Sequence, residues 1–578
     1  MDYAAVYESW RTSSCVDEAT KVELAGIEND VAEIEERFGR ELGFGTGGMR
    51  GKLGAGTSMI NRYTVRRVTQ AYASYLRECV EGSSEAGVVI AYDSRRMSRE
   101  LAEEAARVLA AAGIRAMVFD GIRPTPLLSY AVREMDAAGG IMITASHNPP
   151  EYNGYKIYGS DGVQLLPEEA SQIAARVSGI DDYLCFAAKP VAQVEGIDGE
   201  MDERYVSRVT ELIEELVGDM VSRRDREGLG VVYSPLHGTG YLLVPRALSD
   251  LGFAGLNVVR EQSVPDGDFP TVKLPNPEDP SAFELSIDRA MSMDVRNRPA
   301  IIIATDPDCD RVGVAVWDGE GYRVLSGNQV GVLLADFLIE SAKMRGIELG
   351  ECAIVKTIVT TEMVRALADG EGVHVIDTLT GFKYIGAHID ELEAKGRHFL
   401  LGLEESCGYL AGGFVRDKDG VIASALVASV AAWHMAHGRT LLDRLNELYG
   451  THGYYYERLV SVPIAGDGGG VEALDALRQE MPDYIAGFPV VEVHDYLTGW
   501  TKKRGAGIRV PIDLPRENCI QLVLSRGSKI TLRPSGTEPK LKLYVAVRAG
   551  SQLKAEAKAD AIVTTAMRLL PISQEGYD

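Results

Sequence analysis

The sequence predicts an α/β protein with three similar mixed-sheet α/β domains in tandem and a C-terminal α+β domain, arranged around a central cleft. Short β-rich runs bounded by Gly, Asp or Ser alternate with helical stretches along the first three quarters of the chain. These runs fall into three groups of three, which indicates an internal repeat of domain size. The chain has 578 residues, enough for about three to five domains at roughly 100 to 200 residues each.

Each repeat has the same order of predicted elements. The predicted strands are residues 88–94, 115–121 and 140–146, then 231–238, 256–261 and 300–306, then 353–359, 373–378 and 398–405. A helical stretch, SRELAEEAARVLAAAG (98–113), follows the first strand, and LLVPRALSDLG and TTEMVRALADG have the same place in the other repeats. The third strand of each repeat runs into a polar loop. Because ligands of open α/β sheets bind outside the carboxyl ends of strands, three such loops can converge on one cleft.

The last quarter of the chain has a different pattern. Beyond about residue 445, strand-like runs in VVEVHDYLTGW and CIQLVLSRGSKITLRPSG precede a terminal helix, SQLKAEAKADAIVTTAMRLL. This order predicts a fourth domain of α+β type. We expect boundaries near residues 200, 325 and 440, which gives domains at residues 1–200, 201–325, 326–440 and 441–578.

The net charge limits the partners. There are 60 basic and 84 acidic residues, a net charge of −24, and so acidic a surface repels phosphodiester backbones. We therefore expect no nucleic-acid partner. An anionic ligand needs a pocket in which Arg, Lys, backbone N–H groups or a metal reverse the sign locally.

The cysteines and the N-terminus bear on location. Seven cysteines are scattered without a C-x-x-C pair, which argues against a disulfide framework or a structural zinc site and favours a reducing compartment. The start, MDYAAVYESWRTSS, lacks the features of a signal peptide. The longest near-apolar run, from Val421 to about Ala436, is shorter than the ~20 residues of a membrane helix. We expect a cytoplasmic protein with no membrane partner.

The first polar loop, TASHNPPEYNGYK (144–156), begins where a strand ends. Its Pro-Pro and Asn-Gly pairs force a tight, non-helical backbone around Ser146. Such a turn exposes a hydroxyl, although a Ser beginning an ordinary turn would have the same local sequence.

The second loop, TDPDCDR (305–311), carries alternating carboxylates. Asp306, Asp308 and Asp310 follow an apolar strand, and Arg311 comes next. Hard divalent cations prefer oxygen ligands, and Mg²⁺ usually keeps waters and a phosphate oxygen beside its carboxylates. The later residues of a calcium-binding EF-hand loop are missing. The loop therefore predicts a metal site with a phosphate partner; an acidic hairpin without metal is the alternative.

Two further segments suit an anion. RPSGTEPK (533–540) follows a strand-like run and combines Arg, hydroxyls, Gly and Lys in one loop, as a phosphate nest requires. It does not match a Walker-type loop. The Gly-rich ELGFGTGGMRGKLGAG (41–56) contains Arg50 and Lys52 and allows close backbone approach. An ordinary surface turn and a flexible loop are the respective alternatives.

The third repeat adds a cation and carboxylates at strand ends. TLTGFKYIG (378–386) contains Lys383, and LEESCGYL contains Glu404, Glu405 and Ser406. Such residues are usually solvated surface groups. Their position after predicted strands makes them candidates for the cleft.

Taken together, these motifs resemble the α-D-phosphohexomutase superfamily, the phosphoglucomutase/phosphomannomutase enzymes. The matching motifs, in order, are FGTGGMRG, TASHNPPEYNGYK, PNPE (275–278), DPDCDR, TGFKYIG, EESCGYL and RPSGTEPK. The length and the TGFK and EESCGY variants are most similar to the long bacterial α-phosphoglucomutase and phosphoglucomutase-2 group. The resemblance implies an isomerase that interconverts glucose 1-phosphate and glucose 6-phosphate through a phosphoserine and a glucose 1,6-bisphosphate intermediate. It leaves mannose phosphates open as additional substrates.

The resemblance also implies a role for each motif residue. The phosphoserine would be Ser146, which with Asp306, Asp308 and Asp310 would hold one Mg²⁺. The groups implied around the transferring phosphoryl are Arg50, Lys156 and Arg311, with Lys383 as general base and His147 in a supporting part. The sugar hydroxyls would contact Glu404 and Ser406. The non-reacting phosphate would be held by the 533–540 loop through Arg533, Ser535, Gly536, Thr537 and Lys540.

Three positions depart from the pattern that the resemblance implies. Some phosphomannomutase relatives carry a His where this chain has Gly408, which favours the phosphoglucomutase side and Lys383 as base. Leu403 and Cys309 stand where many relatives have Gly. Either side chain could alter the geometry of its loop.

Several alternatives stay open at this point. A phosphopentomutase or a hexose-bisphosphate synthase would use the same catalytic loops, and a non-catalytic sugar-phosphate sensor would keep the fold. The expected partners are small sugar phosphates, with a monomer favoured over a dimer.

Overall fold

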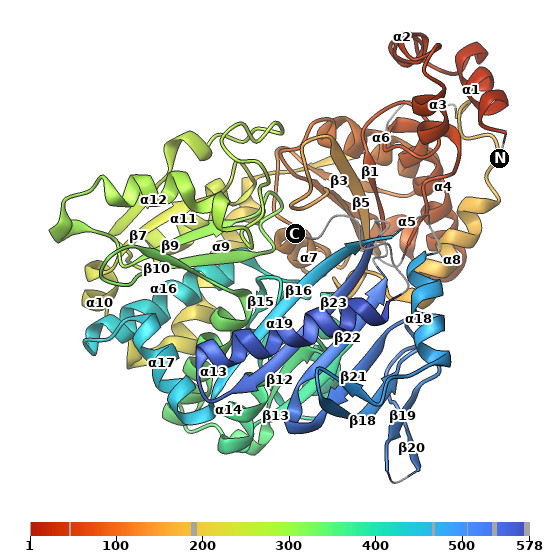
Figure 1. Cartoon of the computed structure of the whole chain (residues 1–578). Coiled ribbons are helices and arrows are strands. Elements are labelled where there is room, and N and C mark those ends of the chain that lie inside the picture. Colours follow the sequence, from red (N-terminus) through yellow and green to blue (C-terminus); the bar gives the residue numbers. More distant parts are fainter. Residues whose placement is uncertain are drawn as a thin grey trace.

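The computed structural model describes residues 2–45, 48–186, 194–464, 469–505, 507–534 and 540–570. In these segments the strands form three mixed sheets and a fourth, antiparallel sheet. Figure 1 follows the chain through them in order, from the red first domain to the blue fourth domain. The predicted α/β class is confirmed. The boundaries near residues 200, 325 and 440 stay predictions, and we use them only to name domains I to IV. The helix Leu441–His452 is described with domain III, because it packs into that domain's core.

The three mixed sheets share one strand order, and so the predicted repeat is confirmed. In each, the first strand of the repeat lies between the second and the third and is parallel to both. A fourth strand then pairs antiparallel with the third. The shared strands are β2 (Val88–Tyr92), β3 (Ala116–Phe119), β4 (Gly139–Ile143) and β5 (Tyr152–Gly159); β7 (Gly230–Ser234), β8 (Gly255–Val258), β9 (Ile301–Thr305) and β10 (Val312–Trp317); and β12 (Cys352–Thr357), β13 (His374–Thr378), β14 (His398–Glu404) and β15 (Gly408–Leu410). Edge strands are β1 (Met49–Lys52), β6 (Val194–Ile197) and β11 (Tyr322–Leu325).

Helices connect the parallel strands and cover the sheets. The connecting helices are α6 (Ser98–Ala111), α7 (Thr125–Glu134), α11 (Gly240–Asp250), α12 (Glu284–Met291), α14 (Met363–Glu371) and α15 (Phe382–Ala394). The remaining helices of domains I to III, apart from the first three, are α4 (Arg62–Cys79), α5 (Ser83–Ala86), α8 (Pro167–Ser178), α9 (Gly199–Val217), α10 (Arg223–Gly228), α13 (Gly327–Met344), α16 (Gly420–Ala436) and α17 (Leu441–His452). Capping explains where several begin: Ser326 accepts from the backbone of Gln329 at the start of α13, and Asp419 caps α16 in the same way.

The apolar helix α16 is almost wholly buried among its neighbours, which accounts for its composition. No single helix in the described segments is long and apolar enough to cross a membrane, and only the sharply bent pair α16–α17 reaches that length and composition together.

Three short helices precede the first sheet: α1 (Tyr3–Thr12), α2 (Glu18–Gly26) and α3 (Val31–Phe38). Each begins at an Asp whose side chain accepts a backbone N–H of the first turn. They enclose an aromatic cluster in which Trp10 contacts Phe38, Tyr63 and Tyr183 edge to face.

The sequence argued against a disulfide framework, but the structure has one disulfide bond. Cys15 and Cys185 form a disulfide bond across 170 residues of chain, with their Cα atoms 4.9 Å apart. The helices α1 to α3 fold back against the end of domain I and bring the two thiols together, a contact that no local spacing in the sequence encodes.

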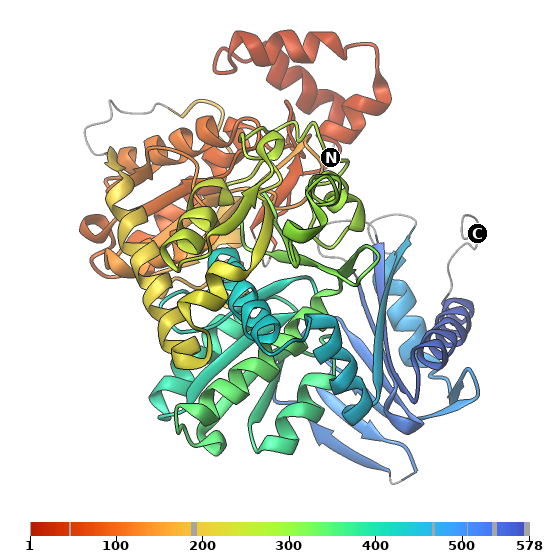
Figure 2. The ribbon, with the colours of Figure 1, turned by 90° about the vertical axis from the view of Figure 1, so that its left-hand side faces the viewer.

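Domain IV is an antiparallel sheet covered by helices on one face. Its strands are β16 (Tyr454–Pro463), β17 (Tyr484–Ile485), β18 (Phe488–Asp495), β19 (Trp500–Lys503), β20 (Ile508–Pro511), β21 (Ile520–Leu524), β22 (Lys529–Pro534) and β23 (Lys540–Ala549), and its helices are α18 (Gly469–Gln479) and α19 (Gln552–Leu569). Figure 2 shows the blue sheet between α19 and the rest of the molecule. The face of the sheet opposite α19 therefore looks toward domains I to III.

The apolar cores explain how the domains are joined. The largest cluster is continuous through domains II and III and reaches the helices of domain I. Domain IV has a separate core of its own. A small cluster of Ile358, Val359 and Leu379 with Tyr496, Cys519 and Tyr544 joins domain IV to domain III. One apolar cluster thus joins domains I to III, and domains I and II have further clusters of their own, whereas domain IV is attached through a much smaller apolar contact.

Candidate active site

The loops between the third and fourth strands of the three repeats lie against one another. Each contains a non-glycine residue with left-handed backbone: Ser146 (φ 50°), Cys309 (φ 52°) and Cys407 (φ 63°). The backbone N–H of Val312 donates to the carbonyl of Cys407 at 2.9 Å, and Oγ of Ser146 donates to Oδ2 of Asp306 at 2.6 Å. Equivalent turns in three domains therefore converge on one site, as the repeat predicts.

Ser146 lies at the centre of this site and is buried. Its hydroxyl donates to Oδ2 of Asp306 at 2.6 Å and lies 3.2 Å from Nδ1 of His147. Its backbone N–H donates to Oγ1 of Thr144 at 2.8 Å. Burial, together with the positive charge of nearby arginines, lowers the pKa of His147 well below its usual value, so its ring is neutral.

Arg95 stabilises the Ser146 loop through hydrogen bonds to its backbone carbonyls. The sequence motifs did not predict this role. Its guanidinium donates to the carbonyls of Ser146 at 2.6 Å, Pro149 at 2.8 Å and Tyr152 at 3.0 Å. Asp93 lies 3.5 Å from Nε of Arg95 and also accepts from the hydroxyl of Thr144 at 2.6 Å. One buried ion pair thus fixes both ends of the loop.

The three aspartates form a compact carboxylate cluster. Asp306, Asp308 and Asp310 are all buried, and one oxygen of each lies within 4.8 Å of the others. Oδ1 of Asp308 and Oδ1 of Asp310 are buried without a hydrogen-bond partner. Burial and the neighbouring aspartates raise the pKa of Asp306 well above its usual value. Orphaned buried carboxylate oxygens are the ligands that a hard divalent cation requires, so this cluster could hold one.

Cationic side chains surround the carboxylates. Nζ of Lys156 donates to Oδ2 of Asp308 at 2.9 Å, and although burial opposes it, this ammonium group lowers the pKa of Asp308. Arg311 pairs with Glu278 of the PNPE motif. Nη1 of Arg50 donates to Oδ1 of Asn148 at 2.9 Å, beside Ser146. Positive charge therefore surrounds the hydroxyl, in a chain whose net charge is negative.

The third-repeat loop brings a polar edge to the same site. Oε1 of Glu404 accepts the backbone N–H of Gly381 at 3.0 Å, and burial raises the pKa of Glu404. Burial also raises the pKa of Glu405 to about 7, and its Oε2 accepts from the hydroxyls of Thr357 at 3.3 Å and Thr360 at 3.4 Å. These groups line the cleft with acceptors for hydroxyls.

The remaining predicted residues divide into three sets. Arg533 pairs with Glu517. Arg533, Ser406 and Lys540 all line the cleft. Lys383 lies in the first turn of α15, largely buried, and burial lowers its pKa to about 8. Ser535, Gly536 and Thr537 lie outside the described residues.

A cleft of about 830 Å³ is lined by several of these groups, although Ser146, the three aspartates and Lys383 are not among its walls. Its walls include Arg50 and His147 from domain I, Arg311 from domain II, Glu404 from domain III and Arg533 and Lys542 from domain IV. A sugar carrying phosphate at both ends fits the polarity of these walls, because cations lie on both sides of a carboxylate-lined centre.

Most of the chain is similar to one family of proteins. Sequence profiles match for phosphoglucomutase/phosphomannomutase alpha/beta/alpha domain I at residues 41–184, domain II at residues 203–319 and domain III at residues 326–452. A phosphoglucomutase of Staphylococcus haemolyticus is 36% identical over 518 residues, which covers 89% of this chain and 91% of the relative. A phosphoglucomutase of Staphylococcus aureus is 36% identical over 527 residues.

The chain belongs to the phosphoglucomutase/phosphomannomutase family. The resemblance read from the motifs is thereby confirmed. Solved structures agree at the level of the fold: a phosphoglucomutase/phosphomannomutase family protein of Burkholderia thailandensis has a TM-score of 0.65 at 21% identity and covers 93% of this chain and 98% of its own. The open form of parafusin from Paramecium has a TM-score of 0.65 at 19% identity, with 91% and 94% coverage.

Lys418 is a cleft residue that the motifs of this family did not reveal. Its Nζ lies 3.1 Å from Oδ2 of Asp310 and 3.4 Å from Oδ1 of Asp417. A Cβ on Gly408 would lie 2.3 Å from Cδ of Lys418, so the Lys418 stem fills the space that a side chain at position 408 would need. The space beside Gly408 is therefore occupied by a cation from a different loop. The only sequence signal was the adjacent charges of DKD (417–419).

Glycines opposite the other two departures make room for them. A Cβ on Gly331 would lie 2.6 Å from Cδ1 of Leu403, and a Cβ on Gly240 would lie 2.9 Å from Sγ of Cys309. Both larger side chains are fully buried. The structure thus accommodates both larger side chains in its interior.

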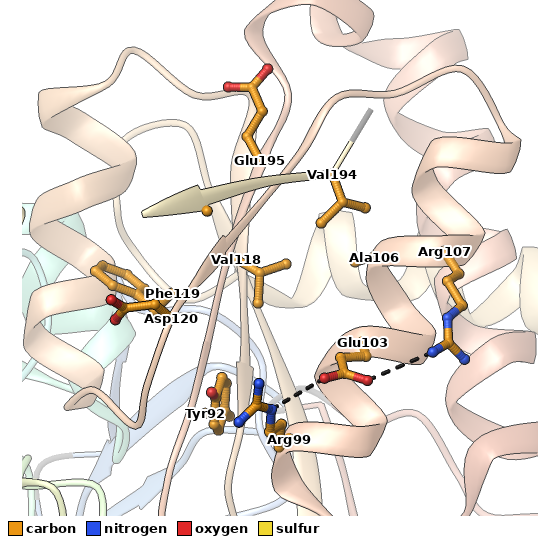
Figure 3. Close-up of a pocket in the computed structure, with 11 residues that line it drawn as sticks. Tyr92, Arg99, Glu103, Ala106, Arg107, Val118, Phe119, Asp120, Val194 and Glu195 are labelled. Carbon is orange, nitrogen blue, oxygen red and sulfur yellow. Dashed lines mark hydrogen bonds and ion pairs between the residues drawn. The ribbon is translucent and has the colours of Figure 1, made fainter. Parts of the chain in front are cut away.

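A second cavity, of about 330 Å³, lies in domain I between α6 and the edge strand β6 (Figure 3). Its cations are paired at its own wall: Arg99 lies 3.2 Å and Arg107 lies 3.6 Å from the carboxylate of Glu103. None of the predicted site residues lines it. We therefore assign the chemistry to the cleft among the four domains.

Proposed function

We propose that this protein is a phosphoglucomutase. It interconverts glucose 1-phosphate and glucose 6-phosphate through phosphorylated Ser146 and a glucose 1,6-bisphosphate intermediate. The observation that carries the proposal is the hydroxyl of Ser146, 2.6 Å from Asp306 in a buried carboxylate cluster, next to His147 and Asn148, which line a large polar cleft. The 36% identity to curated phosphoglucomutases supports it.

The phosphoryl group moves between Ser146 and a sugar hydroxyl. In the forward direction the bond from Ser146 Oγ to phosphorus breaks, a bond from the 6-hydroxyl oxygen of glucose 1-phosphate forms, and the hydroxyl proton leaves to a base. Lys156, Arg311 and Arg50 neutralise charge on the transferring oxygens, which is the main catalytic contribution in phosphoryl transfer. The bisphosphate then turns around, and its other phosphate returns to Ser146.

The cation that we propose for the aspartate cluster is Mg²⁺, held by Asp306, Asp308, Asp310 and the phosphate on Ser146. When bound, it supplies charge neutralisation at the phosphoryl oxygens. Asp306 keeps its position through the backbone N–H groups of Asp310 and Arg311, each 3.1 Å from its Oδ1.

Lys383 is the proposed general base, because a base must be neutral to accept a proton. Burial lowers the pKa of Lys383 to about 8, whereas the pKa of Lys156 and that of Lys418 are raised, despite burial, by the aspartates beside them. Lys383 is therefore the better matched of the three ammonium groups to proton transfer near neutral pH.

The two ends of the substrate have different proposed contacts. Glu404 and Ser406 bind the sugar hydroxyls, and Arg533 and Lys540, together with Ser535, Gly536 and Thr537, hold the phosphate that is not reacting. This second site has to accept either phosphate of the intermediate. His147, neutral and 3.2 Å from Ser146 Oγ, has a supporting part in orienting the hydroxyl.

The experiment that tests the proposed substrate is a comparison of kcat/KM. The purified protein, with Mg²⁺ and a hexose 1,6-bisphosphate primer, is assayed with glucose 1-phosphate, mannose 1-phosphate, glucosamine 1-phosphate and ribose 1-phosphate. We expect the highest value for glucose 1-phosphate. A higher value for ribose 1-phosphate would overturn the proposal in favour of a phosphopentomutase.

We also propose a cytoplasmic, monomeric enzyme. The Cys15–Cys185 disulfide is unusual for this location, because disulfides are rare in cytosolic proteins. Fractionation of the native source with a thiol-blocking reagent present would test the location and the disulfide together.

A further inference from the structure

A charged network joins domain III to domain IV at the wall of the cleft. Oε1 of Glu362 accepts hydrogen bonds from Nζ of Lys356 and from Nζ of Lys529, each at 2.9 Å. Glu362 and Lys356 belong to domain III, where Glu362 directly precedes α14. Lys529 is the first residue of β22 in domain IV. The contact between Glu362 and Lys529 therefore crosses from one domain to the other.

Domain III neutralises Glu362 without help from domain IV. Nε of Arg365 lies 2.9 Å from Oε2 of Glu362. Oδ2 of Asp377 accepts from Arg365 at 2.5 Å, and Oδ1 of Asp377 lies 2.9 Å from Nζ of Lys356 as an ion pair. Two cations and two carboxylates thus balance within domain III. Although burial opposes it, Lys356 and Lys529 lower the pKa of Glu362, so it stays ionised. Lys529 can therefore move away from Glu362 without leaving an unpaired buried charge. Such a charge would be costly and would oppose release, so its absence makes the contact reversible.

Other contacts between domains III and IV constrain the orientation of domain IV only weakly. The apolar cluster around Ile358 and Tyr544 is small, and apolar contact is not directional. Nε2 of Gln521 donates to the carbonyl of Ile358 at 3.1 Å. The chain passes from α17 to β16 at Gly453, whose left-handed φ of 88° makes a turn there. The Glu362–Lys529 pair, by contrast, joins opposite charges at 2.9 Å and is directional.

The pair also sets the position of the distal phosphate site. Lys529, Thr531 and Arg533 alternate along β22 and all line the cleft, while Ile530 and Leu532 point into the core of domain IV. Because these residues share one strand, fixing Lys529 fixes the position of Arg533.

We propose that the Glu362–Lys529 pair is a latch that holds domain IV with Arg533 directed into the cleft. Glu362 and Lys529 are positioning residues in this role, which rests on the proposed function. Breaking the latch leaves the carboxylate cluster and Ser146 untouched but lets domain IV move outward, so binding of the distal phosphate weakens more than the chemical step.

The test compares four substitutions in the full-length protein, of which Lys529→Arg keeps the charge. Lys529→Met removes the charge and keeps the stem, and Glu362→Gln removes the acceptor's charge. Glu371→Gln is the matched control, since Glu371 pairs with Lys343 at 2.7 Å, at the other end of α14 and away from the cleft. The measurements are the radius of gyration without ligand, by small-angle X-ray scattering, and kcat and KM for glucose 1-phosphate.

We expect Lys529→Met and Glu362→Gln each to enlarge the radius of gyration and to raise KM by about five- to tenfold, with kcat within about twofold of wild type. Lys529→Arg should restore both values, and Glu371→Gln should change neither. An unchanged radius in both latch variants would overturn the proposal.

Two further outcomes separate the alternatives. A raised KM for Lys529→Met with a normal KM for Glu362→Gln would show that Lys529 binds the ligand itself, against a latch. Failure of the wild-type protein to turn over any sugar phosphate would remove the proposed function, yet the scattering comparison would still decide whether the pair holds domain IV.

Discussion

Oγ of Ser146 donates a hydrogen bond to Oδ2 of Asp306 at 2.6 Å, although 160 residues separate them in the chain. The two lie at the ends of equivalent strands, β4 and β9, in two copies of one repeat. The contact joins a nucleophilic hydroxyl to a carboxylate cluster with orphaned oxygens. Repetition of one fold thus builds the site: each domain contributes the loop at the same strand end.

Removal of a carboxylate should weaken cation binding and activity together. Asp308 is fully buried, and its Oδ1 has no hydrogen-bond partner within the described chain. We expect Asp308→Asn to lower Mg²⁺ affinity by more than the roughly 10- to 100-fold that outer-shell changes cost. Titration of activity with Mg²⁺ after chelation measures this. Equal Mg²⁺ dependence in the variant and wild type would rule out the cluster as the metal site.

Activity should rise with pH through the titration of Lys383. Burial lowers the pKa of Lys383 to about 8, so its neutral, proton-accepting form increases as the pH rises from 7 to 9. We expect kcat to rise over this range and level off above it. Lys383→Arg should lose this limb and about 10²- to 10⁴-fold of kcat. A variant that keeps the wild-type pH profile would exclude Lys383 as the base.

The same pKa shift affects stability with a definite sign. A lysine with a folded pKa near 8 and an unfolded pKa near 10.5 binds fewer protons when folded between these values. The unfolded state holds the extra proton, so this group's contribution to stability increases as the pH rises from about 8 to 10.

A methyl group at position 408 should displace Lys418. The added Cβ would lie 2.3 Å from Cδ of Lys418, so the side chain must move away from Asp310. We expect Gly408→Ala to lower kcat/KM by about tenfold, equivalent to about 1.4 kcal/mol of transition-state stabilisation. Gly370→Ala is the matched control, because nothing lies within 4 Å of a Cβ there. Equal kcat/KM in the two variants would show that Lys418 has no part in the reaction.

The disulfide should be detectable by thiol counting. The structure has one bond, Cys15–Cys185, and five free cysteines. Protein denatured without reductant should therefore titrate five thiols, and reduction should add two. Cys15→Ser should lower the free energy of unfolding of the oxidised protein by about 2–4 kcal/mol. Seven thiols before reduction would contradict the bond.

The sequence predicted the repeats and the loops because both are local. Alternating apolar runs mark β2 to β4, and the polar residues after β4, β9 and β14 mark the strand ends where Ser146, Asp306 and Glu404 lie. Motif resemblance then supplied roles that spacing alone left open. The fold class and the family followed from these features.

The contacts that the sequence could not predict join distant segments. Arg95 reaches the Ser146 loop across 51 residues, and Cys15 reaches Cys185 across 170. The stem of Lys418 packs against Gly408, where the lack of a side chain leaves room for it. Only the three-dimensional structure reveals this contact. Each of these three contacts depends on tertiary geometry rather than on a local pattern, so the residues around it in the sequence do not predict it.

The measurement that tests the account most directly is phosphoryl transfer to Ser146. The protein is incubated with Mg²⁺ and glucose 1,6-bisphosphate labelled in its phosphates, and the label is located by peptide mass spectrometry. We predict one phosphoryl group per chain, on Ser146, which glucose 1-phosphate discharges as labelled bisphosphate. Ser146→Ala should take up no label and lose turnover while it keeps the wild-type unfolding transition. Wild-type turnover in Ser146→Ala, or label on another residue, would contradict the central claim.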